Sequence, residues 1–301
     1  MVLQDTDFWN TLSPKGSVKI CIADTGYDIN HEDLPKQPNV TGSNNDEYPG
    51  EDWRFDGHGH GTHCAGTIAA IGSNDKGVVG IIPDNKYGNF RLVIAKADGD
   101  GDTDGIMETV ETCKQNGANI ISLSLGCYDC PTEIEKDYYN KLYAEDGIPL
   151  IAAAGNIGTF SKMYPASYPS LMSVAAIDAY KDRASFSQYN NQVEISAPGV
   201  SVLSTLPFNS YASWSGTSMA TPHVAAVAGL LWMQFPNCTN YQIRNVLNKT
   251  AKDLEDDFPG CDKYTGYGLV QAKDAYDLLS QGNCGGEIGK EIPEGMILCI
   301  I

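Results

Sequence analysis

The sequence predicts an α/β protein with a mostly parallel, twisted sheet and helices on both faces of that sheet. Short apolar runs rich in β-branched residues recur along the chain, and stretches with helical periodicity separate them. The expected strands are residues 18–23, 92–95, 119–125, 150–154 and 172–176. The clearest expected helices are residues 105–115 and 132–145. Strands that alternate with helices form three-layer folds, in which ligands bind beyond the carboxyl ends of the strands.

The chain has 301 residues, which is long enough to bury a large core. No repeat or linker interrupts residues 1–280, so we expect one domain there. Residues 281–301 are rich in Gly and end in an apolar cluster, and we expect a short tail or the beginning of a longer segment. The first residues lack the regions of a signal peptide, so we expect a trimmed sequence or an incomplete gene start.

The formal net charge of −18 argues against nucleic acid and anionic membrane surfaces as partners. The longest apolar stretch with helical character is residues 224–235, which is far shorter than the about 20 residues of a membrane helix. We therefore expect a soluble protein.

One segment places a serine at the start of an Ala-rich helix. Residues 216–223 read Gly-Thr-Ser-Met-Ala-Thr-Pro-His, so Ser218 is expected at or near a helix N-terminus. The helix dipole and the free N–H groups stabilise negative charge there, which suits an oxyanion. A serine hydroxyl becomes a nucleophile only beside a base whose tautomer is fixed by a third group.

Candidates for these two partners follow the first expected strand. Asp24 stands at its carboxyl end, and the next segment contains His58, His60 and His63. Spacing alone does not choose among the three histidines, and so dense a His/Asp cluster is also compatible with a metal site. The cluster lacks the His-Glu-x-x-His spacing of zinc proteases, which favours a nucleophilic mechanism.

The chain here resembles the subtilisin-like serine proteases, the subtilase family that includes subtilisin and proteinase K, over about residues 18–276. Three motifs carry the resemblance, in the family's order: Asp-Thr-Gly from Asp24, His-Gly-Thr-His from His60, and Gly-Thr-Ser-Met-Ala-Thr-Pro-His around Ser218. The resemblance implies a serine endopeptidase of broad specificity that acts through an acyl-enzyme. It also selects His60, because the first histidine of that motif is the base in the family. The alternative is an inactive relative that binds peptides, and the filled catalytic positions favour the enzyme.

The resemblance further implies residues around the substrate. Residues 152–156 match the family's oxyanion segment, so Asn156 is expected to donate its side-chain amide to the oxyanion. The substrate is expected to lie as an added strand between two chain edges. The residues expected to contact it are Gly99, Asp100, Gly101, Ser124, Leu125, Gly126, Ala154 and Gly155.

Two positions are expected to shape the primary specificity pocket. Ile157 stands where many relatives carry an acidic residue, and Met163 stands where relatives often have Gly at the pocket floor. Together they predict an apolar, shortened pocket that prefers medium-sized hydrophobic side chains. The acidic residues 98–104 either favour basic residues upstream of the cut or form a solvated loop.

Calcium is the expected structural cofactor, and no catalytic metal is expected. Residues Asp100 to Glu111 fit the EF-hand loop pattern, but the preceding residues are expected to form a strand and not a helix. The family resemblance implies other sites. One comprises Asp33 with Asn74 or a neighbour, and a weaker one comprises the carbonyl groups of Ala166 and Tyr168 with Glu194.

Nine cysteines and three Asn-x-Ser/Thr sequences are compatible with a secretory route. We expect a secreted monomer that acts on proteins or peptides, with a vesicular or lysosome-like compartment as the alternative. The resemblance also implies a pro-segment that assists folding, which this sequence does not contain. The cysteine expectations are buried, reduced thiols at Cys21 and Cys64 and disulfides Cys127–Cys130, Cys238–Cys261 and Cys284–Cys299.

Overall fold

The computed structural model describes residues 2, 7–44, 52–83, 86–97, 103–254, 260–282 and 284. Its centre is a sheet of seven strands in the order β2-β3-β1-β4-β6-β8-β9, and every neighbouring pair is parallel. The strands are β1 (Val18–Asp24), β2 (Val40–Ser43), β3 (Phe90–Lys96), β4 (Ile120–Leu123), β6 (Leu150–Ala153), β8 (Leu171–Ile177) and β9 (Val193–Pro198). Each apolar run that was expected to be a strand lies in this sheet, so the predicted α/β class is confirmed.

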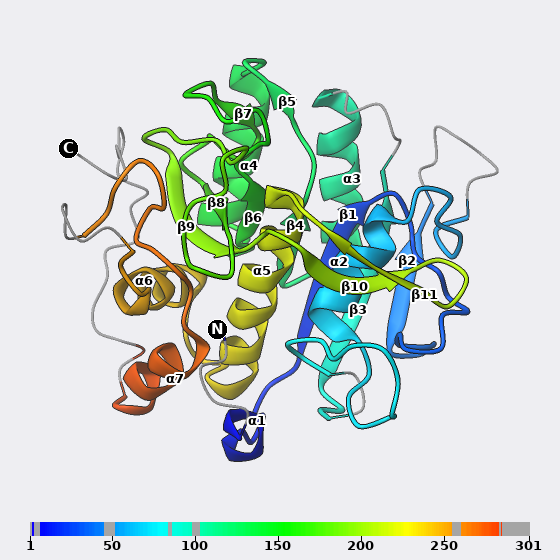
Figure 1. The fold of residues 1–301 in the computed structure, drawn as a ribbon. Helices are drawn as coiled ribbons and strands as arrows, with labels where there is room; N and C mark the ends of the chain where they lie inside the picture. Colours follow the sequence, from blue (N-terminus) through cyan, green and yellow to red (C-terminus); the bar gives the residue numbers. More distant parts are fainter. Residues whose placement is uncertain are drawn as a thin grey trace.

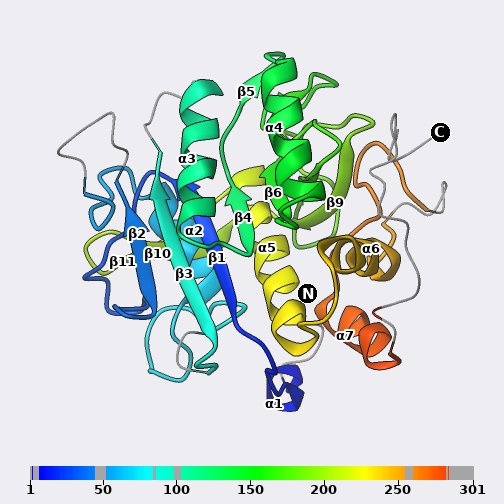
Figure 2. The ribbon, with the colours of Figure 1, turned by 180° about the vertical axis from the view of Figure 1, so that it is seen from behind.

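Helices cover both faces of the sheet (Figure 1 and Figure 2). Strand β1 shows how the faces divide, because alternate side chains point in opposite directions. Ile20 and Ile22 pack with α2 (His60–Ala69) and the long α5 (Thr217–Gln234), whereas Cys21 and Ala23 pack with α3 (Thr103–Gln115) and α4 (Glu133–Ala144). The remaining helices are α1 (Phe8–Thr11), α6 (Asn240–Thr250) and α7 (Ala272–Ser280).

Two short antiparallel strand pairs stand apart from the main sheet. Strands β10 (Val202–Leu206) and β11 (Ser210–Trp214) form an antiparallel hairpin that packs on α2. Strands β5 (Cys127–Tyr128) and β7 (Met163–Tyr164) form the other antiparallel pair. Both pairs were absent from the sequence prediction, because their residues show neither a long apolar run nor a clear alternation.

The disulfides correct part of the cysteine prediction. Cys21 is not reduced, because it is bonded to Cys113 and ties β1 to α3. Cys238 pairs with Cys284, so both pairings that had been expected for these cysteines are wrong. Cys261 is also disulfide-bonded. The disulfide Cys127–Cys130 and the buried free thiol of Cys64 are confirmed.

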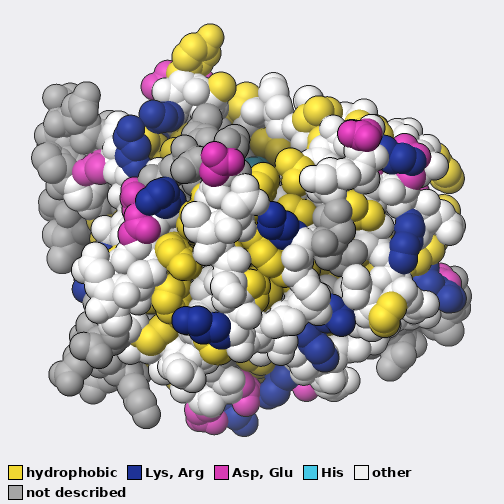
Figure 3. Space-filling model, turned by 90° about the horizontal axis from the view of Figure 1, so that it is seen from below, with side chains coloured by type: hydrophobic (Ala, Val, Ile, Leu, Met, Phe, Trp, Pro, Cys, Tyr) yellow, Lys and Arg dark blue, Asp and Glu magenta, His cyan; other side chains and the backbone are white. Residues whose placement is uncertain are grey.

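The face at the amino ends of the strands carries mixed charges. Seen from below, Lys and Arg side chains lie scattered among neutral, apolar and acidic ones (Figure 3). Within the residues that the structure describes, no helix is long and apolar enough to cross a bilayer. The carboxyl ends of the strands face the opposite side of the molecule, where the predicted site residues lie.

Candidate active site

Asp24 and His60 meet at the carboxyl edge of the sheet. Asp24 is the last residue of β1 and is 2% exposed, and His60 is the first residue of α2. Their side chains are joined by a contact of 2.7 Å between Asp24 Oδ1 and His60 Nδ1. Asp24 Oδ1 also accepts a hydrogen bond from Thr25 N at 2.8 Å. This geometry places the proton of the neutral imidazole on Nδ1 and leaves Nε2 as the basic nitrogen.

The surroundings of His60 favour its charged form. Burial by itself lowers the pKa of His60, but the charge and hydrogen bond of Asp24, together with the charge of Asp56, outweigh burial and raise that pKa. Asp56 also fixes the start of α2, since its carboxylate accepts hydrogen bonds from Gly59 N and from Thr62 N and Oγ1. Sequence reasoning gave Asp56 no role, although it begins the His-rich segment.

The structure separates the three neighbouring histidines. His63 is buried one turn after His60, and its Nε2 lies 3.0 Å from Val202 O and 3.2 Å from Ala212 O. Burial lowers the pKa of His63 to about 4, so it stays neutral near pH 7. His58 is exposed, with its ring 6.1 Å from that of His60. Only His60 of the three bonds to Asp24, and the three rings do not converge on a common metal position.

Ser218 lies in the first turn of α5, as the sequence predicted. Its Oγ donates to Ser124 O at 3.1 Å, and its carbonyl oxygen accepts from Ser124 Oγ at 2.9 Å. No hydrogen bond joins Ser218 Oγ to His60 here, although both residues are described. A rotation of the hydroxyl toward His60 is therefore required for proton transfer, and catalytic contacts are often this loose without substrate.

The side-chain amide of Asn156 is held in one orientation by Thr217. Asn156 Oδ1 accepts from Thr217 N at 2.8 Å and from Thr217 Oγ1 at 2.9 Å, and Gly155 N donates to Thr217 Oγ1 at 3.1 Å. Because the oxygen is engaged with donors, the Nδ2 group remains free to donate elsewhere. A Cβ at Gly216 would lie 3.7 Å from Asn156 Nδ2, so this group is close to the Ser218 segment. Thr217 belongs to the serine motif, but the motif alone does not reveal this contact with Asn156.

The predicted substrate residues fall into two groups. Gly99, Asp100 and Gly101 lie outside the described residues. The other edge is close to the site, because Ser124 contacts Ser218, and Leu125 and Gly126 follow it directly.

Met163 lies beneath the two glycines of the expected pocket. A Cβ at Gly126 would lie 2.8 Å from Met163 Cε, and one at Gly155 would lie 3.1 Å from Met163 Sδ. Met163 is buried, as is Ala154, whereas Ile157 is 52% exposed. The geometry therefore puts Met163, and not Ile157, in the interior of this region.

Asp100 to Glu111 do not form an EF-hand, in agreement with the strand that was expected before this segment. The element before this segment is strand β3, and helix α3 begins at Thr103, the fourth position of the pattern. An EF-hand needs a helix before the loop and a non-helical loop through most of its twelve residues.

Asp33 lies beside the loop that contains Asn74. The Asp33 side chain is fully buried, and its carboxylate accepts from Asn74 Nδ2 at 2.7 Å and from Val78 N at 2.9 Å. Carboxylate and amide oxygens suit Ca²⁺, and a turn of the Asn74 amide would present its oxygen in place of its nitrogen. These residues fit a calcium site.

Glu194 does not fit the second expected calcium site. Its carboxylate is fully buried and accepts from Arg244 Nε at 2.6 Å, from Arg244 Nη2 at 2.5 Å and from Asn248 Nδ2 at 2.7 Å. The carbonyl group of Tyr168 accepts from Leu171 N. Ala166, two residues before Tyr168, is also buried. A guanidinium already neutralises Glu194, so a cation has no free carboxylate oxygen there.

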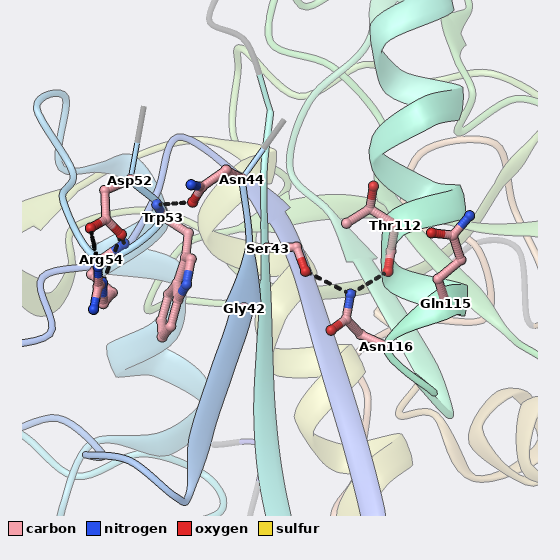
Figure 4. A pocket seen from close by; sticks show the side chains of 9 residues that line it. All are labelled: Gly42, Ser43, Asn44, Asp52, Trp53, Arg54, Thr112, Gln115 and Asn116. Carbon is pink, nitrogen blue, oxygen red and sulfur yellow. Dashed lines mark hydrogen bonds and ion pairs between the residues drawn. The ribbon is translucent and has the colours of Figure 1, made fainter. Parts of the chain in front are cut away.

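A separate polar pocket lies at the edge strand β2 (Figure 4), and none of its lining residues is a predicted site residue. It lies between the end of β2, the segment around Trp53 and helix α3. Asn116 Nδ2 donates to Ser43 Oγ and to Thr112 O, and Arg54 pairs with Asp52. These groups are engaged with one another, and the pocket contains none of the catalytic candidates.

Comparisons with known proteins agree with this geometry. Residues 15–268 match the model of the Subtilase family. The chain is 41% identical to Subtilisin DY from Bacillus licheniformis and 42% identical to Subtilisin BL from Lederbergia lenta, over 86% of this chain and 90% of each relative. It also superimposes on the crystal structure of the psychrophilic subtilisin-like protease Apa1 from the Antarctic Pseudoalteromonas sp. AS-11, with a TM-score of 0.81, 29% identity and coverage of 93% of this chain and 97% of that one. The chain therefore belongs to the subtilase family and is a serine endopeptidase.

Proposed function

We propose that Ser218 is the nucleophile, His60 the general base and Asp24 the group that orients His60. The observation that carries this assignment is the 2.7 Å contact between Asp24 and His60 at the sheet edge where α5 presents Ser218. His60 Nε2 takes the proton as Ser218 Oγ attacks the peptide carbonyl carbon, and then returns it to the leaving amine. Water then attacks the acyl-enzyme with the same proton transfers through His60, which releases the acyl product and restores Ser218. The Asn156 amide and the Ser218 N–H stabilise the oxyanion.

The variant Ser218→Ala tests the nucleophile. We expect its hydrolysis of an unfolded protein to fall to background and labelling by a sulfonyl fluoride to disappear, because no other group supplies the attacking oxygen. Ser280→Ala, at the distant end of α7, is the matched control and should keep both. Equal rates for the wild type and Ser218→Ala would support the alternative of a peptide-binding protein without catalysis.

We also propose an apolar primary pocket with Met163 as its floor. Met163 is buried beneath Gly155 and Gly126, and an apolar floor offers no partner to a cationic side chain. Cleavage of a peptide library should show medium-sized hydrophobic residues before the cut, and Met163→Gly should extend the preference to larger aromatic residues. Dominance of Lys or Arg at that position contradicts the proposal.

We propose one structural calcium site at Asp33 and Asn74. When bound, the ion would tie the loop after α2 to the segment after β1, and its binding to the folded state would raise the melting temperature. Differential scanning calorimetry with calcium and with chelator should show this difference, and Asp33→Asn should abolish it. The surface variant Asp277→Asn is the control. A melting temperature that is indifferent to chelator in the wild type counts against the site.

We propose that the protein is a secreted monomer whose catalytic domain comprises residues 1–280. The three disulfides among the described residues support an oxidising compartment. Mass spectrometry of protein isolated from the culture medium should find these bonds intact, and sedimentation should give the mass of one chain. Reduced cysteines at Cys21 and Cys113 in the isolated enzyme would contradict the expected location.

A further inference from the structure

Two exposed aromatic side chains stand near the active site, and neither ring stacks on another aromatic ring among the described residues. Phe208, at the tip of the β10–β11 hairpin, is 82% exposed, and Phe55, in the segment before α2, is 58% exposed. They line a cleft of about 380 Å³ together with Asp28, Arg54, Asp56 and Pro207. We call this the aromatic cleft. Burial does not explain either phenyl ring, because most of each ring lies in solvent.

The backbone conformation at the hairpin tip is unfavourable for a phenylalanine at position 208. Phe208 has φ +65° and Asn209 has φ +55°, both in the left-handed region. Glycine and asparagine favour such turns, whereas a bulky side chain is disfavoured there. The tip is also held in place, since Phe208 N donates to Asp28 Oδ2 at 2.8 Å and Glu32 N donates to Asn209 Oδ1 at 2.7 Å. The structure thus presents a phenyl ring at a fixed point where folding would favour glycine.

The charged groups of the aromatic cleft are already engaged within the protein. Asp28 accepts from Asn30 N and Phe208 N, and the Asp56 carboxylate is saturated by the start of α2. Arg54 forms a two-point pair with Asp52. The two phenyl rings are therefore the surfaces left for a ligand, and they favour an apolar side chain.

The aromatic cleft lies beside the segment that leads into α2, the helix that begins with His60. A Cβ at Gly59, the residue before His60, would lie only 3.0 Å from Pro207 Cδ. At the other end of β11, the Trp214 ring lies 6.3 Å from the His60 ring. Phe208 lies six residues before Trp214, a span of at most about 20 Å in extended chain, so an extended substrate that runs past His60 along β11 reaches the cleft within about six residues.

We propose that the aromatic cleft is a secondary binding site for an apolar side chain of the polypeptide substrate, several residues from the scissile bond. Phe208 and Phe55 would hold that side chain between them. The site would favour long, unfolded polypeptides over short peptides, because only a long chain occupies both the cleft and the catalytic groups.

The variant Phe208→Gly tests this proposal without a folding risk, because glycine suits the backbone at that position. Ten-residue fluorogenic peptides would carry one Leu, moved stepwise through an Ala background, and a tetrapeptide amide would serve as the short substrate. We expect wild-type kcat/KM to be about tenfold higher with Leu at one distal position, a gain typical of a hydrophobic subsite. Phe208→Gly and Phe55→Ala should both lose this gain and keep the rate on the tetrapeptide.

The control variant is Tyr180→Ala, which removes another highly exposed aromatic ring. It should behave as the wild type on every peptide. The proposal is overturned if no position of Leu discriminates wild type from Phe208→Gly, or if the control loses the gain equally. A wild-type protein that does not hydrolyse the tetrapeptide would instead count against the proposed triad. The failure of the secondary site and the failure of the triad are therefore distinguishable.

Discussion

Two buried carboxylates in this molecule, Asp24 and Glu194, each contact a basic side chain, and the two pairs are built differently. Asp24 contacts His60 through one oxygen, while its Oδ2 accepts no hydrogen bond of normal geometry from a described residue. Glu194 is saturated by Arg244 and Asn248, and Arg244 Nη2 also donates to the carbonyl groups of Pro169 and Leu171.

The difference separates a chemical role from a structural one. In the proposed mechanism His60 takes up and releases a proton, so its partner changes the energy of a reaction step. Arg244 does not lose its proton, and burial makes an intact pair necessary because removal of one partner leaves an unpaired charge. The Asp24 pair should therefore control rate, and the Glu194 pair should control stability.

Asp24→Asn should give the largest effect. We expect kcat to fall by about 10⁴, the loss seen when this carboxylate is removed from other enzymes with the triad, subtilisin included. Asp24 raises the pKa of His60, so the acid limb of the residual kcat/KM should move to lower pH. Steady-state kinetics from pH 5 to 9 check both results. A rate within tenfold of the wild type would remove Asp24 from the mechanism.

Glu194→Gln should act on stability. The change leaves the guanidinium of Arg244 buried without its counter-charge, so the free energy of unfolding should fall by about 3–5 kcal/mol. Urea unfolding measures this loss, and kcat per folded molecule should not change. Lys273→Ala is the matched control, because it breaks an exposed pair with Asp277 that is worth at most about 0.5 kcal/mol. Equal losses in the two variants would contradict the distinction.

His63 should make the stability pH-dependent. Burial lowers its pKa to about 4 in the folded state, against 6.5 for the free side chain, so the unfolded chain binds more protons between these values. Above pH 6.5 His63 does not lower the free energy of unfolding. As pH falls from 6.5 toward 4, the free energy of unfolding decreases by about 3 kcal/mol. Unfolding at pH 7, 6, 5 and 4.5 should show a shallower loss in His63→Asn than in the wild type. If the free energy of unfolding falls equally with pH in both proteins, His63 is not the cause of the pH dependence.

Thr217→Val should have the smallest of these effects. It removes the hydroxyl that holds Asn156 Oδ1 and accepts from Gly155 N, so the oxyanion donor becomes less well oriented. We expect kcat to fall by about tenfold with KM unchanged, as for one neutral hydrogen bond. Thr217→Ser keeps the hydroxyl and should retain the wild-type kcat. An increase in KM with kcat unchanged would indicate that Thr217 contributes to substrate binding and not to the transition state.

Much of the fold could be predicted because buried parallel strands have a local signature. The runs around Ile22, Val93 and Ile151 are apolar on both faces, and such runs rarely form anything but interior strands. The antiparallel hairpin β10–β11 has no such signature, since residues 202–206 have only two buried positions, which are adjacent, and residues 210–214 have none. Cys21 was misjudged for a related reason, because its bond to Cys113 depends on how α3 packs on β1.

The amino-acid sequence was enough to predict the sheet, the serine at a helix start, the acid after a strand and, through three motifs, the family. These features are short-range patterns of residue type, which the chain carries whether or not it is folded. The folded chain was needed to show that His63 is buried and neutral while His60 bonds Asp24, that Arg244 neutralises Glu194, and that Thr217 fixes Asn156. Each of these features depends on contacts between segments far apart in the chain. Burial and distance in the folded state set the charge of a side chain and decide which of its hydrogen-bond donors and acceptors remain available.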